Sequence, residues 1–341
     1  MKILITGGAG FIGSAFVRFT LREHPEDEVV CLDKLTYAGN LENIAEAFFS
    51  PRFRFVQGDI ACGKKIAGFF RREKFDAVVN FAAESHVDRS IRNPKPFLDT
   101  NVLGVQSLLD ACVRNGVRFH QASTDEVYGD LPLDGGTPFT ETSPLRPSGP
   151  YSASKAGADL LVLSYFRTYG AFVTVTRSSN NYGPYQFPEK LIPLAAAHAL
   201  RGEPVPVYGD GKNVRDWLSA EDHCRAVDLV LRGGRSGEVY NVGGEEMANL
   251  DLVRLILRSL GQSESLVRFV ADRKGHDRRY AVNSAKISRE FGWRPSEKMR
   301  EGIVRTVAWY AEHPDWLAHV EDGSYRDRNA GYLRRYACEK L

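Results

Sequence analysis

Three glycines at a fixed spacing follow the first hydrophobic segment of this 341-residue chain. The segment Lys2–Thr6 leads into Gly7, Gly10 and Gly13, and an amphipathic stretch, Phe11–Arg22, follows. The first glycine permits a tight turn, the second lets the backbone approach a pyrophosphate, and the third allows close contact between helix and strand. The free N–H groups at the start of the helix favour phosphate. The pattern therefore predicts a dinucleotide-binding strand, loop and helix.

An acidic residue sets the type of dinucleotide. Asp33 ends the second predicted strand, 20 residues after Gly13. A carboxylate there accepts hydrogen bonds from the adenosine ribose and repels a 2′-phosphate, which favours NAD over NADP, although Lys34 weakens this preference slightly. Asp59 follows the third predicted strand, and it is expected either to cap the adenine or to be an ordinary turn aspartate.

Short β-branched runs alternate with amphipathic stretches in the first 180 residues. Strands are expected at Lys2–Thr6, Glu28–Leu32, Phe53–Gln57, Asp76–Phe81, Val117–Ser123 and Ala171–Thr176. Helices are expected at Phe11–Arg22, Leu41–Phe49, Lys64–Arg72, Asp99–Asn115 and Tyr151–Tyr169. Repeated βαβ units with right-handed crossovers predict an α/β fold, a doubly wound parallel sheet of Rossmann type with helices on both faces.

The pattern changes near residue 180. Asn181–Pro188 is rich in Gly, Pro and Asn and is predicted to be a loop. Short strands (Val205–Tyr208, Glu238–Val242) then mix with helices (Glu189–Arg201, Ala220–Arg232, Leu250–Leu260, Met299–His313). We expect residues 1–180 to form an NAD-binding domain with the catalytic residues. Residues 181–341 should form a smaller mixed α/β substrate-binding lobe, some of whose elements return to the first domain.

Composition limits the class of protein. The chain has 45 basic and 43 acidic residues, so no bulk charge draws it to nucleic acid or to a membrane. Five cysteines form no C-x-x-C pair, and eight histidines are scattered, so neither a disulfide framework nor a metal site is expected. The first strand leaves no room for a signal peptide, and no apolar run is long enough to span a bilayer. A cytoplasmic location is expected.

A tyrosine and a lysine four residues apart open a predicted helix after Pro150. Tyr151 and Lys155 lie on one helical face. A nearby ammonium favours the phenolate and lowers the tyrosine pKa, which allows Tyr151 to take a proton from a hydroxyl near neutral pH. The alternative is an incidental pair on a surface helix, which the upstream glycine loop disfavours.

Two adjacent acids follow Thr124 at the end of the fifth predicted strand. Asp125 and Glu126 lie where α/β enzymes place their sites. If the chain turns into a helix there, both carboxyls can reach one pocket and act as general acid and general base. The alternative is that acids at a helix start merely suit the helix dipole.

Together the glycine loop and the Tyr-x-x-x-Lys pair resemble the extended type of the short-chain dehydrogenase/reductase family, over nearly the whole chain. In that family the tyrosine is the base, the lysine holds the nicotinamide ribose, and a Ser or Thr, here Thr124, assists the tyrosine. More specific strings resemble the dTDP-glucose 4,6-dehydratases: Ser123–Gly129, Asp33–Asn40, Ala82–Ser90, Asn180–Tyr185, Pro188–Pro193 and Asp272–Tyr280. Lys274 departs from this pattern, since proline is expected there in many members.

The resemblance implies dehydration of dTDP-glucose to dTDP-4-keto-6-deoxyglucose, with NAD as a regenerated cofactor. Tyr151 would act at the 4-hydroxyl, Glu126 would remove the C5 proton, and Asp125 would protonate the departing 6-hydroxyl. Cofactor contacts are expected from Gly7, Gly10, Phe11, Ile12, Gly13, Asp33, Lys34, Thr36, Asp59, Ile60, Ala82, Ala83, Tyr151 and Lys155. Substrate contacts are expected from Ser85, Arg89, Thr124, Asn181, Lys190, Leu191, Pro206, Tyr208, Arg215, Asn249, Arg273 and His276.

The resemblance also implies a homodimer, with Asp99–Asn115 and Tyr151–Tyr169 as candidate interface helices. Two alternatives stay open. The chain could be a related sugar-nucleotide enzyme, such as a 4-epimerase or a dehydratase for another nucleotide, although the Asp125-Glu126 pair argues against an epimerase. It could also be a nucleotide sensor that keeps the fold without catalysis, which the presence of Thr124, Tyr151 and Lys155 disfavours.

Overall fold

An eight-stranded, all-parallel sheet forms the centre of the molecule. The computed structural model describes all 341 residues. The strand order is β10-β6-β5-β4-β1-β2-β3-β13, and every neighbouring pair is parallel. The strands are β1 (Lys2–Thr6), β2 (Glu28–Asp33), β3 (Phe53–Gln57), β4 (Ala77–Asn80), β5 (Arg118–Thr124), β6 (Val173–Ser178), β10 (Glu238–Val242) and β13 (Glu339–Lys340). The order reverses between β1 and β4, and an open α/β sheet binds its ligands at such a switch point.

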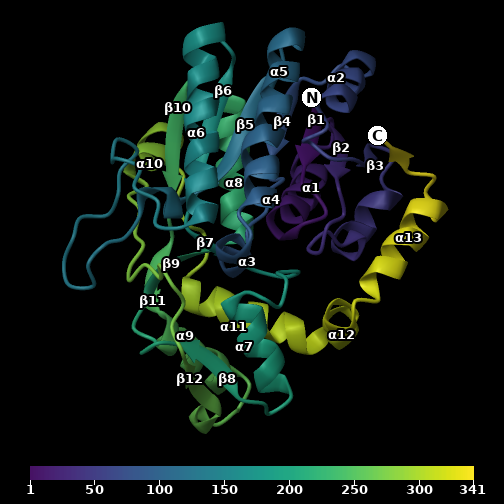
Figure 1. Cartoon of the computed structure of the whole chain (residues 1–341). Coiled ribbons are helices and arrows are strands. Elements are labelled where there is room, and N and C mark those ends of the chain that lie inside the picture. Colours follow the sequence, from purple (N-terminus) through teal and green to yellow (C-terminus); the bar gives the residue numbers. More distant parts are fainter.

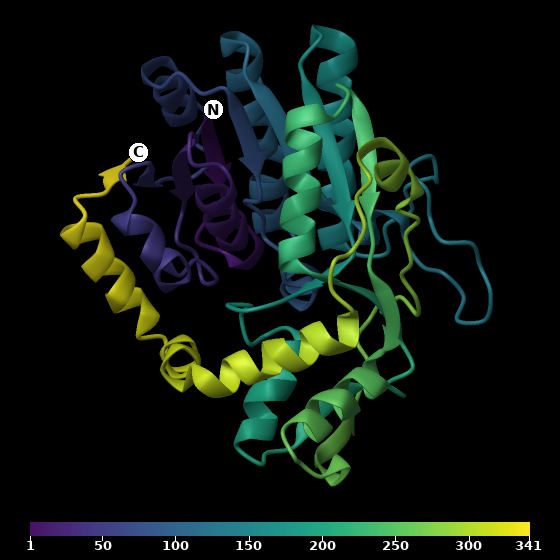
Figure 2. The same ribbon diagram turned by 180° about the vertical axis from the view of Figure 1, so that it is seen from behind.

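Helices cover both faces of this sheet (Figures 1 and 2). One face carries α2 (Gly63–Arg72), α5 (Val105–Asn115) and α6 (Pro150–Tyr169), and the other carries α1 (Phe11–Glu23) and α8 (Ala220–Gly233). Successive β1 side chains point to opposite faces: Leu4 enters the core under α2, α5 and α6, whereas Ile3 and Ile5 enter the core under α1 and α8. The α/β class predicted from the strand pattern is confirmed.

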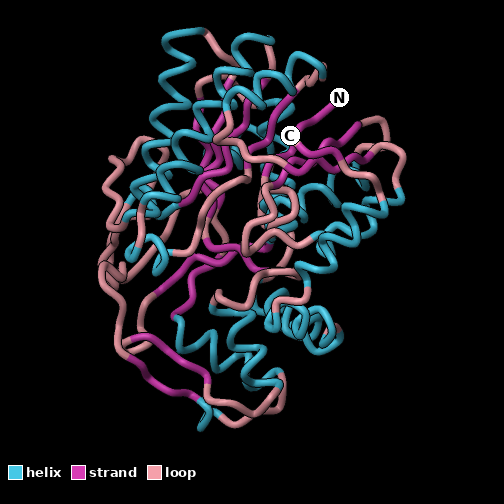
Figure 3. Tube along the Cα trace, turned by 45° about the vertical axis from the view of Figure 1, so that its right-hand side comes forward, coloured by secondary structure: helices cyan, strands magenta, loops and turns pink.

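The C-terminal half adds a smaller body below the sheet. It contains a three-stranded sheet of β7 (Asn180–Tyr182), β9 (Val214–Ser219) and β11 (Glu245–Ala248), and the pair β8 (Val205–Tyr208) and β12 (Val267–Val270). Helices α7 (Leu191–Leu200), α9 (Asn249–Ser259) and α11 (Met299–Glu312) share one apolar core with these strands. In Figure 3 these smaller strands lie below the large sheet.

The C-terminal segment returns from this lower body to the far edge of the large sheet (Figures 1 and 2). It consists of α12 (Pro314–Asp322), α13 (Tyr325–Arg335) and β13, which pairs with β3. The Trp316 indole donates to Asn43 Oδ1 at 3.0 Å, and the ring of Tyr336 stacks on Phe48 at 4.5 Å. The sequence pattern did not predict these last elements.

Short helical segments complete the fold. They are η1 (Leu41–Phe49), α3 (Val87–Arg92), α4 (Lys95–Leu98), η2 (Asp99–Gly104), η3 (Asp125–Tyr128), η4 (Glu264–Leu266) and α10 (Ala285–Phe291). No helix combines the length and hydropathy needed to cross a bilayer.

Two helices predicted from sequence differ in type. Asp99–Asn115 is a wide π-helical segment up to Gly104 and an α-helix only from Val105 onward. The backbone of Gly104 packs so closely on Ile60 that a Cβ atom there would lie 2.7 Å from Cδ1 of that side chain. The predicted helix Leu41–Phe49 is a 3₁₀ segment with a kink at Ile44.

Candidate active site

A cavity of about 520 Å³ opens at the carboxyl ends of the parallel strands, between the large sheet and the lower body. Residues directly after β1, β3 and β4 line it, as do the last residues of β2, β5 and β6. It continues between the two bodies to residues of β8 and β9. The cavity therefore lies at the switch point and runs from there toward the C-terminal lobe.

The glycine loop forms the floor of one end of the cavity. Gly7 has φ +70°, and a Cβ there would lie 2.5 Å from the backbone N of Ala82. A Cβ on Gly13 would lie 2.2 Å from the carbonyl oxygen of Gly7. Helix α1 begins at Phe11, and no side chain caps its N-terminus. Its first N–H groups are thus available to an anion such as a pyrophosphate.

The carboxylate of Asp33 lies half-buried at the end of β2 beside this loop. Its Oδ2 accepts from the backbone N of Ala9 at 3.0 Å, and its Oδ1 accepts from that of Leu35 at 2.7 Å. Burial raises the pKa of Asp33, and the two backbone bonds oppose that rise. Lys34 forms an ion pair with Asp59 at 2.7 Å, so the two charged residues predicted at the adenosine end neutralise each other.

The cavity fits a dinucleotide. Phe11, Ile12, Thr36, Ile60, Ala82 and Ala83 line it, as do the three glycines, Asp33, Lys34 and Asp59. Several buried polar atoms of lining residues lack a partner within the protein: Ser123 Oγ, Ser179 Oγ, Asn180 Oδ1, His223 Nε2 and Asn249 Oδ1. Buried polar atoms are almost always hydrogen-bonded, so these atoms suit a polar ligand.

Tyr151 and Lys155 come from the first turns of α6 and line the cavity. Both side chains are almost fully buried, and Lys155 Nζ donates to the carbonyl oxygen of Ala122 at 2.7 Å. Burial lowers the pKa of Lys155 to about 8. The expectation of a lowered Tyr151 pKa is wrong for this arrangement, because burial and the carboxyls of Glu126 and Asp125 raise it. The Thr124 hydroxyl opposes this rise.

Asp125 and Glu126 lie in η3, the helical turn directly after β5. Thr124 caps this turn, since its hydroxyl accepts from the backbone N of Glu126 at 3.3 Å and donates to Asp125 Oδ1 at 3.2 Å. Glu126 lines the cavity, whereas Asp125 lies behind that lining with 1% exposure, and its Oδ2 has no partner. The turn thus brings Glu126 to the cavity and places Asp125 directly behind it, in a different environment.

These environments act differently on the two carboxyls. Burial raises the pKa of Asp125 well above its ordinary value, and the charges of Glu126 and Asp216 raise it further. Burial also raises the pKa of Glu126, but the nearby cations of Arg273, Lys190 and Arg215 oppose that rise. One carboxyl whose pKa is raised well above its usual range, beside another whose rise three cations oppose, is the arrangement of a general acid and a general base.

Two predicted substrate residues flank the segment between β7 and α7: Asn181 lies in β7, and Lys190 lies directly before α7. Lys190 Nζ donates to the carbonyl oxygen of Ser85 at 2.9 Å, and burial lowers its pKa. Asn181 Oδ1 accepts from Nδ1 of His223 at 2.7 Å, while its Nδ2 donates to the carbonyl oxygen of Ser179 at 2.9 Å. His223, which burial keeps neutral with a pKa of about 3, therefore orients the Asn181 amide.

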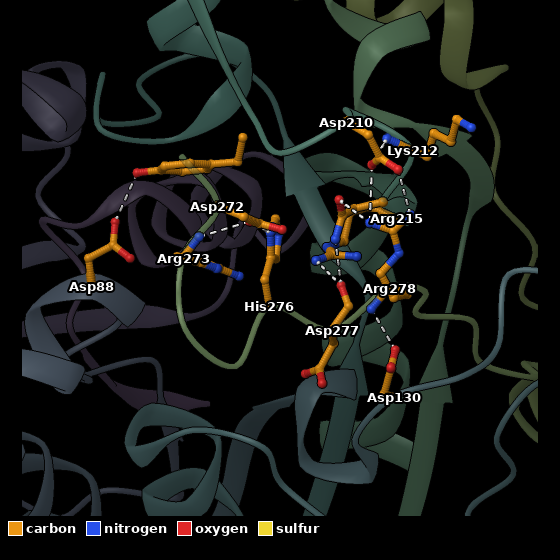
Figure 4. A network of polar contacts seen from close by, with 12 residues as sticks. Asp88, Asp130, Asp210, Lys212, Arg215, Asp272, Arg273, His276, Asp277 and Arg278 are labelled. Carbon is orange, nitrogen blue, oxygen red and sulfur yellow. Dashed lines mark hydrogen bonds and ion pairs between the residues drawn. The ribbon is translucent and has the colours of Figure 1, made fainter. Parts of the chain in front are cut away.

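The predicted basic residues cluster where β9 and residues 272–278 meet the cavity (Figure 4). Arg215 of β9 donates to the carbonyl oxygen of Asp277 at 2.8 Å. His276 Nδ1 lies 2.6 Å from Asp272 Oδ1, and the buried Nε of Arg273 has no partner. Guanidinium groups pair bidentately with phosphate oxygens, so Arg215 and Arg273 suit a diphosphate.

Most other predicted substrate residues also line the cavity: Ser85, Leu191, Pro206, Tyr208 and Asn249. The Tyr208 hydroxyl donates to Asp88 Oδ2 at 3.2 Å across the cavity mouth. Arg89 is not among the lining residues. Its guanidinium lies 3.7 Å from the centre of the Tyr37 ring, because that aromatic face attracts the cation.

Residues in or beside the cavity were missed in the sequence, notably the lining residues Glu189 and His223 and the tyrosine Tyr37, which bonds to Glu189. Tyr37 and Glu189 fall within the strings Asp33–Asn40 and Pro188–Pro193, so proximity to named site residues was an available signal. His223 is a lone histidine on α8, and nothing in the local sequence distinguishes it from a core residue.

A glycine-loop cavity in a doubly wound sheet, with a buried tyrosine and lysine from one helix and a threonine from the adjacent strand, defines an extended short-chain dehydrogenase/reductase. The family model described as GDP-mannose 4,6 dehydratase matches residues 4–306. A dTDP-glucose 4,6-dehydratase of Neisseria meningitidis is 50% identical, over 97% of this chain and 99% of its own. The chain belongs to the dTDP-glucose 4,6-dehydratase family.

Solved structures agree with this assignment. A dTDP-glucose 4,6-dehydratase from Streptomyces venezuelae with NAD bound has 52% identity and a TM-score of 0.90, over 94% of this chain and 100% of its own. A UDP-glucose 4-epimerase from Thermus thermophilus, in complex with NAD, has 32% identity and a TM-score of 0.84, over 91% of this chain and 99% of its own. The fold is thus shared with epimerases, and residues of the site must separate the two reactions.

Proposed function

We propose that the chain dehydrates dTDP-glucose to dTDP-4-keto-6-deoxyglucose, by oxidation at C4, elimination of water across C5–C6 and reduction at C6. One observation carries this proposal: Asp125 and Glu126 lie in one helical turn next to Tyr151 but in environments that separate their pKa values. A simple dehydrogenase needs only the tyrosine and lysine. Elimination of a hydroxide from C6 needs a second base and an acid.

The proposed cofactor is NAD, held by the glycine loop, Asp33 and the Lys34–Asp59 pair at one end. When bound, NAD supplies reversible hydride transfer, so that the hydride from C4 is returned to C6. In this proposal Lys155 holds the nicotinamide ribose. The ammonium is already positioned there by its bond to the carbonyl oxygen of Ala122.

In the first step the Tyr151 oxygen takes the proton of the sugar 4-hydroxyl. Burial and two acids raise the pKa of Tyr151, and the Thr124 hydroxyl, which opposes that rise, favours its phenolate. The resulting 4-ketone makes the C5 proton acidic.

In the second step Glu126 removes the C5 proton and the C6–O bond breaks. Asp125 gives its proton to the departing oxygen, which leaves as water. Glu126 is suited to the base role because Arg273, Lys190 and Arg215 favour its ionised form. Asp125 is suited to the acid role because burial and the neighbouring negative charges favour its protonated form.

For the substrate, we propose that Arg215 and Arg273 bind the diphosphate, and that Pro206 and Tyr208 flank the base. Asn181 from β7 and Lys190 from the segment after it would contact the sugar phosphate region. These assignments are supported by the position of all six residues along the cavity. Arg89 is left out of this set because its guanidinium packs on the ring of Tyr37.

The second candidate is a sugar-nucleotide 4-epimerase, which the similarity to the Thermus thermophilus enzyme keeps open. Incubation of the purified protein with dTDP-, UDP- and GDP-glucose, followed by mass and NMR analysis of products, separates the two. A 4-keto-6-deoxy product from dTDP-glucose supports the proposal. A galactose product, or dehydration of another nucleotide sugar in preference, contradicts it.

We also propose a homodimer and a cytoplasmic location. Large apolar side chains are exposed on η2, α5 and α6: Leu103, Val113, Leu160, Phe166 and Tyr169. Burial of this surface by a second copy would stabilise the dimer, and sedimentation at micromolar concentration tests it.

All five cysteines are free thiols, which suits a reducing compartment. In this proposal residues 1–180 bind the cofactor and residues 181–341 form the substrate-binding lobe.

A further inference from the structure

A cluster of side chains joins the loop over the adenosine end of the cavity to the C-terminal lobe. We call residues 34–40 the cofactor loop, since Lys34, Thr36, Ala38 and Gly39 line the cavity. Its central residue is Tyr37, whose hydroxyl donates to Oε1 of Glu189 at 3.0 Å across 152 residues of sequence.

Two further groups pack on the Tyr37 ring. The Arg89 guanidinium lies over its face at 3.7 Å, and the Phe187 ring meets its edge at 5.7 Å. Burial and the charge of Glu189 raise the pKa of Tyr37, so the hydroxyl stays a donor at neutral pH. The tyrosine is therefore held through its hydroxyl, its face and its edge.

Glu189 is the anchor on the C-terminal side. Its side chain is 12% exposed, and Oε2 lies 3.5 Å from Nε2 of His86 and 3.8 Å from Nη2 of Arg89. The next residue, Lys190, also crosses to the first body, by its bond to the carbonyl oxygen of Ser85. Two successive residues of one loop thus attach the substrate end of the cavity to the sheet domain.

The cofactor loop needs such support. Leu35 has φ +58°, a conformation that a leucine adopts only when its surroundings hold it there. The C-terminal segment holds the other side of the loop. The Tyr325 hydroxyl donates to the carbonyl oxygen of Tyr37 at 2.5 Å, and Asn329 Nδ2 donates to that of Gly39 at 2.9 Å.

We infer that Tyr37 and Glu189 form a latch that retains the dinucleotide through turnover and couples its retention to occupancy of the substrate end. The inference rests on the proposed function, in which a hydride taken from the sugar must be returned to the same sugar. A dinucleotide under the cofactor loop leaves only if the loop opens, and opening breaks the Tyr37–Glu189 bond. Lys190 and Leu191 follow Glu189 and line the cavity. A ligand bound to them therefore restrains Glu189 and, through the Tyr37–Glu189 bond, the cofactor loop.

The test measures cofactor release from the purified holoenzyme, reloaded with NAD where necessary. Tyr37→Phe removes the hydrogen bond, and Glu189→Gln removes the charge that strengthens it and the pairs with His86 and Arg89. We expect each to make NAD release roughly 10- to 100-fold faster. Exchange against labelled NAD gives the rate, and nucleotide analysis after gel filtration gives the bound fraction. Saturating NAD should restore most of kcat, because neither residue is assigned a chemical step. The matched control is Glu264→Gln, which removes an exposed carboxylate paired with Arg254 and Arg258.

Coupling gives a second readout. Thymidine diphosphate at saturation should slow NAD release from the unaltered enzyme several-fold more than from Glu189→Gln. Release rates equal to those of the unaltered enzyme in both variants overturn the inference. If Glu189→Gln does not fold, Tyr37→Phe decides alone, since it deletes one oxygen and leaves the ring. NAD release is measured without turnover. If the protein dehydrates no nucleotide sugar, the proposed function is wrong, but the release rates still test the latch.

Discussion

Replacement of Asp125 by asparagine should have opposite effects on catalysis and on stability. The side chain is 1% exposed, and Asn has the same shape, so Asp125→Asn removes the proton to be donated and little packing. General acid catalysis contributes roughly 10²- to 10⁴-fold. We expect kcat to fall by that factor, with the 4-keto stage accumulating because C4 oxidation does not need this acid.

The sign of the stability effect is opposite. The folded pKa of Asp125 is raised by burial and by Glu126 and Asp216. Its contribution to stability is complete below the unfolded pKa of about 3.9 and is lost as the pH rises through the raised folded value. Each pKa unit of that rise costs about 1.4 kcal/mol at higher pH. Asparagine does not titrate, so the variant should equal the unaltered protein near pH 4 and exceed it at pH 8.

Scanning calorimetry and steady-state kinetics test both halves. For a chain of 341 residues, each pKa unit corresponds to roughly 2 °C in Tm. The pH profile should also lose the alkaline decline that deprotonation of Asp125 causes, and keep the acid decline from protonation of Glu126. A variant that unfolds more easily at pH 8, or that retains full activity, would refute the assignment of Asp125 as a buried, protonated acid.

Three other substitutions test separate parts of the account. Tyr151→Phe should lower kcat by about 10²- to 10⁴-fold without accumulation of a 4-keto product, and detection of that product by mass spectrometry would contradict the base role. Gly13→Ala places a methyl group 2.2 Å from the carbonyl oxygen of Gly7, so a titration should show weakened NAD binding; unchanged affinity would be inconsistent with that contact. Asp159→Asn leaves Arg177 buried without its 2.8 Å carboxylate partner, which should cost about 3–5 kcal/mol, or about 4–7 °C in Tm for 341 residues. A calorimetric shift below 1 °C would argue against that pair.

The sequence predicted the large sheet well because local patterns determine it. The strands Lys2–Thr6 and Phe53–Gln57 have the predicted bounds, and their β-branched and aromatic residues are bounded by glycine and turn residues. The three-stranded sheet was missed in all its members. Its strand Asn180–Tyr182 has three residues, too few for a period to be recognised.

Long-range contacts account for the other differences. The π-helical segment before Val105 ends where Gly104 packs on Ile60, 44 positions away in sequence, a contact that no local pattern reports. The pKa of Tyr151 was predicted in the wrong direction because the spacing to Lys155 was visible, while burial and the approach of Glu126 were not. By contrast, the cavity brings together Thr124, Glu126 and Tyr151. This was predictable because helix α6 packs on strand β5 and on the turn that follows it.

The most direct test of the central claim follows a single hydrogen atom. In the proposed mechanism the hydride taken from C4 returns to C6 of the same sugar while the dinucleotide stays bound. dTDP-glucose deuterated at C4 should give a 4-keto-6-deoxy product that carries the deuterium at C6, and a mixture with unlabelled, mass-tagged sugar should show no transfer between molecules. Loss of the deuterium to solvent, its retention at C4, or its appearance on the other sugar would contradict the account.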